Sequence, residues 1–162
     1  MIHPLTIQEL RLIKTLAYQI WPICYAKILD SSQISYMLSK FYSIENLENL
    51  YNNNHKFVVL YQHDLPVGFA SFEHNIDNLK KTKLHKLYID ITLQKKGLGQ
   101  KLVNYVIMQA AIYGDTAVFL NVNRNNDAIY FYEKNNFKIT HQEDINIGDG
   151  YFMNDYVMEK VL

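Results

Sequence analysis

The stretch LYIDITLQKKGLGQK, residues 87–101, runs from an apolar strand pattern through a glycine-containing loop into a helical pattern. Gly97 and Gly99 fall where the helix would begin, and they remove side chains that would block the close approach of an anion. Amide hydrogens at the helix start, the helix dipole and the flanking lysines all favour a negative group. The stretch therefore predicts a pyrophosphate-binding strand–loop–helix unit, although a tight turn beside solvated lysines would give the same spacing.

Two better-known phosphate loops do not match this stretch. A dinucleotide-binding loop would need a third glycine where the chain has Leu102, and a nucleoside triphosphate loop would need glycine, lysine and serine or threonine in succession. A nucleotide-binding enzyme is therefore a poorer interpretation of the loop.

Helical patterns fill the first third of the chain. Thr6 and Glu9 fit a capping box, and the apolar residues that follow recur at helical spacing until Pro22. Serines precede two further helical patterns. The expected helices cover residues 6–21, a segment that starts at Ser31 or Ser32, and a segment from Ser43 to the asparagines at 52–54.

Strand patterns begin at Lys56 and alternate with two helices. His63 and Asp64 form a turn between two apolar runs, which predicts an antiparallel hairpin, and Gly114 is expected to end the helix after the glycine loop. Asn125 is a candidate cap for a last helix that ends near residue 135. The expected strands are residues 57–61, 67–72, 84–91, 118–122, 137–145 and 151–161, which gives a mixed sheet flanked by helices in one domain, residues 1–162.

These segments resemble the GNAT superfamily of N-acetyltransferases. The family hallmark is Gln or Arg, any two residues, Gly, any residue, then Gly or Ala, and residues 94–99 match it. Residues 87–89 resemble the family's central strand. The second cofactor-binding segment of the family resembles Leu120-Asn121-Val122 followed by Asn125, Ala128, Tyr130, Phe131, Tyr132, Asn136 and Phe137. The resemblance covers roughly residues 57–140, and residues 1–55 match the helical region that members vary to build the acceptor site.

The resemblance implies an α/β fold with a central, mostly antiparallel sheet and a V-shaped splay between the strands of Leu87 and Leu120. It also implies acetyl-CoA as the acetyl donor, with direct transfer to an amine. A main-chain amide of Leu87 or Ile89 would stabilise the oxyanion. The residues implied in cofactor binding are Leu87, Tyr88, Ile89, Gln94, Lys95, Lys96, Gly97, Leu98, Gly99, Gln100, Lys101, Asn121, Asn125 and Ala128.

The resemblance also suggests which side chains move protons. Tyr132 occupies the position from which family members commonly protonate the departing thiolate, and Tyr130 should point to another helix face. His85 is the candidate base for the amine, with Glu73 and His74 as rivals. Each of these side chains has aromatic or strand packing as its alternative role.

The acceptor is expected to be a primary amine of a small molecule such as a polyamine, or of a peptide, because the closest general resemblance is to small bacterial enzymes that acetylate such amines. Aromatic residues of the first helices are candidates for the acceptor pocket, with core packing as the alternative: Trp21, Tyr25, Tyr36 and Tyr42. A non-catalytic acyl-CoA sensor or interaction module is the alternative function.

Composition and spacing narrow the ligands, partners and location that we expect for the protein. The formal net charge is zero, so no long-range field would hold a nucleic acid. Cys24 is the only cysteine and no His-x-x-x-His pair occurs, so we expect no metal. No segment approaches the roughly 20 apolar residues that span a bilayer, which predicts a cytoplasmic protein with no membrane partner. An apolar patch on residues 151–162 would favour a homodimer.

Overall fold

The computed structural model describes residues 1–93 and 97–162. Their strands form a seven-stranded sheet in the order β1-β2-β3-β4-β5-β7-β6. The chain divides into two compact units, the first made of residues 1–73 and 86–106 and the second of residues 74–85 and 107–162. Strand β4 (Lys81–Ile89) and helix α4 (Leu98–Tyr113) contribute to both units. The mixed α/β fold predicted from the sequence is confirmed.

Three helices of the first unit lie close to their predicted positions: α1 (Arg11–Cys24), α2 (Ser31–Phe41) and α3 (Ile44–Asn52). The Glu9 carboxylate accepts from the Thr6 amide at 2.8 Å, but this capping box begins a short 3-10 turn, η1 (Ile7–Glu9), that leads into α1. Ser43 caps α3 as predicted, accepting from the Asn46 amide at 3.2 Å.

Two helix boundaries differ from the prediction. Helix α1 continues through Pro22 to Cys24. Pro22 itself has no amide hydrogen to donate, and the last turn closes when the Tyr25 amide donates to the Trp21 carbonyl at 3.0 Å. The cap of α2 is Asp30, which accepts from the Gln33 amide at 2.7 Å. Asp30 acts in place of Ser31 or Ser32 because its carboxylate already reaches the first free amides.

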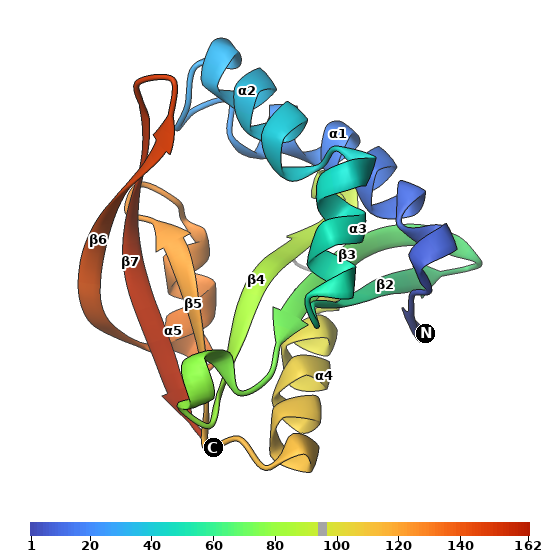
Figure 1. Ribbon diagram of the computed structural model, residues 1–162, viewed down its shortest axis with the longest axis vertical. Coiled ribbons are helices and arrows are strands. Elements are labelled where there is room, and N and C mark those ends of the chain that lie inside the picture. The colour runs from blue at the N-terminus through green and yellow to red at the C-terminus, as the bar shows by residue number, and fades with distance from the viewer. Residues whose placement is uncertain (94–96) are drawn as a thin grey trace. The chain divides into compact units, whose positions relative to one another are not determined.

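The hairpin of the first unit joins β2 (Lys56–Gln62) to β3 (Leu65–Glu73) in antiparallel register (Figure 1). His63 and Asp64 form its turn with φ angles of 49° and 61°, the left-handed values that a two-residue hairpin turn requires. A short strand, β1 (Ile2–Pro4), pairs with β2. The sequence did not predict β1, because three residues are too few for a strand pattern to show.

The second unit contains β5 (Ala117–Asn123), α5 (Ala128–Lys134) and the long β6–β7 hairpin (Figure 1). Strand β4 pairs with β5 in parallel from Lys81↔Ala117 to Leu84↔Leu120. Strand β7 (Tyr151–Val161) lies between β5 and β6 (Lys138–Gly148) and is antiparallel to both. The strands after residue 117 therefore lie where the sequence predicts them.

The prediction that Asn125 caps the helix after β5 is wrong. Helix α5 begins at Ala128, whose amide donates to Asn126 Oδ1 at 2.9 Å, while the Asn125 amide donates to Asn123 Oδ1 at 2.9 Å. Asparagine side chains readily bond the backbone two residues ahead, and these turns delay the helix start.

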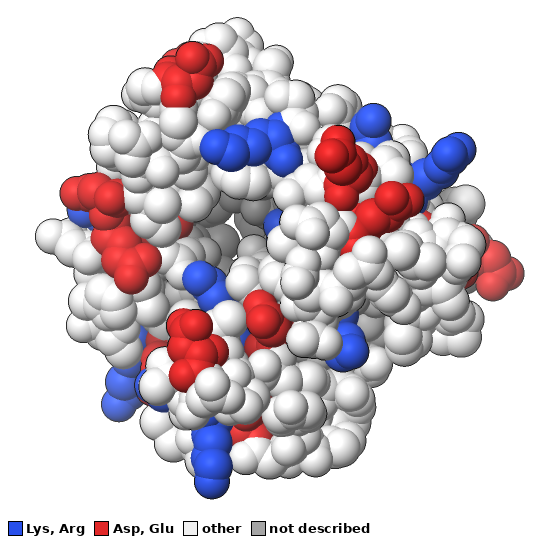
Figure 2. Space-filling model, in the orientation of Figure 1, with Lys and Arg blue, Asp and Glu red and all other residues white. Residues whose placement is uncertain are grey.

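Figure 2 shows acidic and basic side chains interspersed on the face that it draws, in keeping with the zero formal net charge. Within the described ranges, no helix combines the length and the apolar composition that a membrane span requires.

Candidate active site

The glycine loop supplies the start of α4. Gln94, Lys95 and Lys96, three of its predicted cofactor-binding residues, lie outside the described residues. Gly97 has φ of 75° and a Cβ built on it would meet nothing within 4 Å, so the left-handed backbone, rather than crowding, requires glycine there. The Lys101 amide donates to the Gly97 carbonyl at 3.2 Å. The amides of Leu98 and Gly99 precede this first helical bond and, with the helix dipole, suit a phosphate group.

The 87–89 part of β4 presents its side chains to both faces. The Ile89 side chain is buried, while the Tyr88 ring lies 5.4 Å from the ring of Phe69 and 5.6 Å from that of Trp21. The Tyr88 hydroxyl lies 3.0 Å from the Tyr25 hydroxyl, and burial raises the pKa of Tyr88 well above its usual value. Tyr88 therefore anchors this strand to the helical region through its side chain.

Three of the four aromatic residues predicted near the acceptor share one cluster. The Trp21 ring lies 4.6 Å from Tyr25 and 5.4 Å from Tyr42. Tyr36 contacts Lys40 on its own helix, with Lys40 Nζ 5.4 Å from the ring centroid. Lys86, which sequence reasoning did not single out, places Nζ 5.2 Å from the Tyr42 centroid, and burial lowers the pKa of Lys86 to about 8.

Tyr132 and Tyr130 point to different faces of α5, as predicted. Tyr132 is 7% exposed and Tyr130 is 67% exposed. The Tyr132 ring packs on Phe131 at 5.2 Å and on Phe137 at 5.7 Å between centroids. Its aromatic environment fixes the ring in the second unit, whereas Tyr130 projects into solvent.

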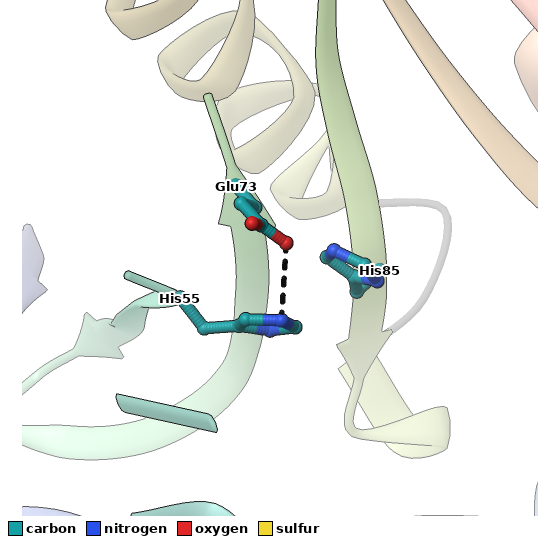
Figure 3. Close-up of side chains that lie close together, drawn as sticks. All are labelled: His55, Glu73 and His85. Atoms are coloured by element: carbon teal, nitrogen blue, oxygen red, sulfur yellow. Dashed lines mark ion pairs between the residues drawn. The ribbon is translucent and has the colours of Figure 1, made fainter. Parts of the chain in front are cut away.

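The candidate bases differ in their surroundings. His85 is half-buried on β4. Glu73 forms an ion pair with His55, with 3.2 Å between Oε2 and Nε2 (Figure 3). His74 Nδ1 lies 2.8 Å from Thr82 Oγ1, and that hydroxyl donates to the buried Asp115 at 2.6 Å. These partners give Glu73 and His74 clear structural roles.

Asn121 belongs to a polar group that the sequence did not reveal. Its side-chain amide donates to Glu143 Oε2 at 3.0 Å, and His141 Nε2 lies 3.2 Å from Glu143 Oε1. These two contacts, the Asn121 bond first, lower the pKa of Glu143. Nearby Asp155 is 6% exposed, and its burial, followed by the Glu143 charge, raises the pKa of Asp155 to about 6. The sequence signal for this polar group was the presence of Glu143 within the expected strand 137–145 and of Asp155 within the expected strand 151–161.

Comparison with known proteins identifies the family. The family model of the acetyltransferase (GNAT) domain matches residues 53–139. The spermine/spermidine N(1)-acetyltransferase of Bacillus subtilis strain 168 is 31% identical over 132 residues, which cover 75% of this chain and 86% of that protein.

Comparison with solved structures supports the same assignment. The PaiA N-acetyltransferase of Thermoplasma acidophilum, in complex with coenzyme A, has a TM-score of 0.83 and 26% identity over 100% of this chain and 98% of that chain. The GCN5-related N-acetyltransferase of Rhodopseudomonas palustris shares the fold, with a TM-score of 0.85 and 15% identity over 100% of this chain and 95% of that chain. The chain therefore belongs to the GNAT family and is an N-acetyltransferase with acetyl-CoA as its acetyl donor.

Proposed function

We propose that this enzyme acetylates a primary amine of a small molecule such as a polyamine, with a peptide amine as the second choice. The observation that carries this proposal is the similarity to the spermine/spermidine N(1)-acetyltransferase of Bacillus subtilis, which spans 75% of the chain. That similarity reaches beyond residues 53–139, the part matched by the family model. It therefore includes positions outside the part of the chain that the family model matches.

Acetyl-CoA, when bound, supplies a thioester whose carbonyl carbon an amine can attack. In our proposal the amides of Leu98, Gly99 and Gln100, with Lys101 and the loop residues 94–97, hold the pyrophosphate. The left-handed Gly97 and the helix start behind it fit that group. The main chain of residues 87–89 binds the pantetheine arm, and an amide of Leu87 or Ile89 donates to the thioester carbonyl oxygen. Asn121, Asn125 and Ala128 complete the donor site.

Two side chains move protons in this proposal. Tyr132 Oη donates a proton to the departing sulfur, because a phenol with a pKa near 10 can protonate a thiolate whose conjugate acid lies near 8.5. His85 accepts the proton that the attacking amine loses. Support for Tyr132 is its buried position on α5, and support for His85 is its half-buried position on β4, two residues before the 87–89 stretch.

An acyl-CoA sensor without transfer activity is the competing proposal. It would use the same donor site, and it differs in requiring neither an acceptor nor a proton donor. Acceptor-dependent turnover separates the two.

Mass spectrometry of the products tests the acceptor class. The purified protein is incubated with acetyl-CoA and, separately, with spermine, spermidine, putrescine, free amino acids and a lysine-containing peptide. We expect monoacetylated spermidine or spermine as the main product. Acetylation of the peptide alone would show that the acceptor is a peptide and not a polyamine. The absence of an acetylated product with every amine would favour the acyl-CoA sensor.

A further inference from the structure

Asp155, in the middle of β7, is a buried carboxylate with no direct partner. Its residue surface is 6% exposed, yet no hydrogen bond or ion pair to its carboxylate occurs within residues 1–93 and 97–162. Burying a charge without a partner is costly, and such groups normally pair or bind a cation. The fully enclosed side-chain atoms that lack a hydrogen bond in the described residues belong to other side chains, so the Asp155 carboxylate is largely buried but still open to a small ligand.

Strand register places a second carboxylate beside it. Asp155 is the direct cross-strand partner of Asn123 on β5 and of Glu143 on β6. Directly opposite residues of an antiparallel pair share one face of the sheet, with Cβ atoms about 5 Å apart. Lys160 lies on the other face of β7, where Nζ donates to the Asn135 carbonyl just beyond α5 at 3.1 Å. Asp155 and Glu143 thus occupy the sheet face opposite α5.

The neighbouring cations do not neutralise Asp155. Arg124 and Lys83 both lower the pKa of Asp155, but burial and Glu143 outweigh them. The Arg124 guanidinium donates to Gln142 at 3.0 Å and to Asp144. Lys83 Nζ lies 5.6 Å from the Phe119 ring centroid. Each cation has a contact of its own, so a net negative site remains at Asp155.

We propose that Asp155 and Glu143 form a binding site for a second ammonium group of the acceptor, which makes the acceptor a diamine or polyamine. This inference rests on the proposed function, because it names the acceptor of the same enzyme. A primary ammonium carries three donors and one charge, which suit the carboxylate of Asp155 and a remaining lone pair of Glu143. Asn121 and His141 hold the Glu143 carboxylate in place.

An organic ammonium fits this pair better than a divalent metal ion. Both Glu143 oxygens already have polar contacts, Oε2 with Asn121 and Oε1 with His141. A hard divalent ion requires six or more oxygen ligands, including freely available carboxylates. The positive charges of Arg124 and Lys83 would also oppose a doubly charged ion more than a single ammonium.

Binding without acetyl-CoA tests the site independently of transfer. Calorimetric titration measures the affinity for spermidine and for n-butylamine, which has one ammonium, in the wild type, Asp155→Asn and Glu143→Gln. We expect Asp155→Asn to weaken spermidine binding roughly tenfold to a hundredfold, with a smaller effect of Glu143→Gln. Asp149→Asn, the same chemical change in the exposed turn between β6 and β7, should bind spermidine like the wild type.

Kinetics then separates this site from the proposed function. The ratio of kcat/KM for spermidine to that for n-butylamine should fall at least tenfold in Asp155→Asn and stay constant in Asp149→Asn. Transfer to spermidine with an unchanged ratio and unchanged affinity would overturn the ammonium site and leave the transferase intact. Absence of transfer together with Asp155-dependent spermidine binding would instead remove the proposed function. A calorimetric signal with Mg²⁺ or Ca²⁺ as strong as that with spermidine, lost in Asp155→Asn, would overturn the ammonium assignment in favour of a metal.

Discussion

Gly68 on β3 lies against the main chain of Tyr88 on β4. A Cβ built on Gly68 would fall 2.6 Å from the Tyr88 carbonyl oxygen and 2.5 Å from Ile89 Cδ1. The Asp90 amide donates to the Val67 carbonyl at 2.8 Å beside this contact. Glycine at position 68 therefore lets β3 pack directly against the part of β4 that we propose to bind the pantetheine arm.

Gly68→Ala should destabilise the protein and weaken acetyl-CoA binding. The added methyl group meets a backbone oxygen, so the two strands must separate, at a cost of about 1–3 kcal/mol. We expect a lower melting temperature together with a higher KM for acetyl-CoA, measured by thermal denaturation and steady-state kinetics. A Gly68→Ala protein with the wild-type melting temperature would refute the close packing of these strands.

Gly97→Ala and Gly114→Ala form a matched pair at the two ends of α4. The glycines have φ angles of 75° and 96°, and a Cβ on either would meet nothing within 4 Å. Both substitutions should therefore cost about 1–2 kcal/mol of backbone strain, which for a chain of this size lowers the melting temperature by roughly 2–8 °C. Only Gly97→Ala should raise the KM for acetyl-CoA. Equal KM values in the two variants would argue against a phosphate site at the start of α4.

Asp155→Asn should stabilise the protein at neutral pH. Burial raises the pKa of Asp155 to about 6 from 3.8, so the folded state binds the carboxyl proton more tightly than the unfolded chain does. The stability that comes from this bound proton is lost as the pH rises through 6. A shift of this size corresponds to about 3 kcal/mol when the group is fully ionised. The gain in free energy of unfolding should be large at pH 7.5 and small below pH 4, because the charge on Asp155 is lost over the window between pH 6 and pH 3.8; urea denaturation measures it.

The same titration must be separated from the charges that face Asp155. These are Glu143 on β6, Arg124 after β5, and Lys83 on β4; His141 contacts Glu143. Asp149→Asn controls for the change in net charge, and the Glu143→Gln background tests the second carboxylate. A gain from Asp155→Asn that is equal at pH 4 and pH 7.5 would contradict a raised pKa.

Lys86→Met should also stabilise the protein near pH 7. Burial lowers the pKa of Lys86 to about 8 from 10.5, so the unfolded chain binds this proton more tightly and wild-type stability rises with pH between 8 and 10.5. The advantage of Lys86→Met in thermal denaturation should therefore shrink from pH 7 to pH 9.5. Lys56→Met, at an exposed position of β2, should show no such trend. An advantage that stays constant with pH would mean that packing, rather than charge, causes the difference in stability between Lys86→Met and the wild type.

Local patterns predicted much of the fold because they depend on neighbouring residues. Ser43 begins a helix and His63-Asp64 turn a hairpin through interactions that span only a few positions. Asn125 failed as a cap because its neighbours Asn123 and Asn126 accept from the amides of Asn125 and Ala128 and form turns before the helix starts. Asp155 was not predicted because its significance lies in the register of β5, β6 and β7, which brings Glu143 opposite it from 12 residues earlier in the chain.

The most direct test of the central claim, transfer of acetyl to an amine with Tyr132 as the proton donor, is coenzyme A release from acetyl-CoA in the presence and absence of spermidine. Tyr132→Phe is compared with Tyr130→Phe, because both remove one hydroxyl but Tyr132 is 7% exposed and Tyr130 is 67% exposed. We expect spermidine-dependent release in the wild type and in Tyr130→Phe, and a fall in kcat of roughly 100-fold or more in Tyr132→Phe. Wild-type kcat in a folded Tyr132→Phe protein would contradict the proton donor, and release that is independent of every amine would contradict transfer itself.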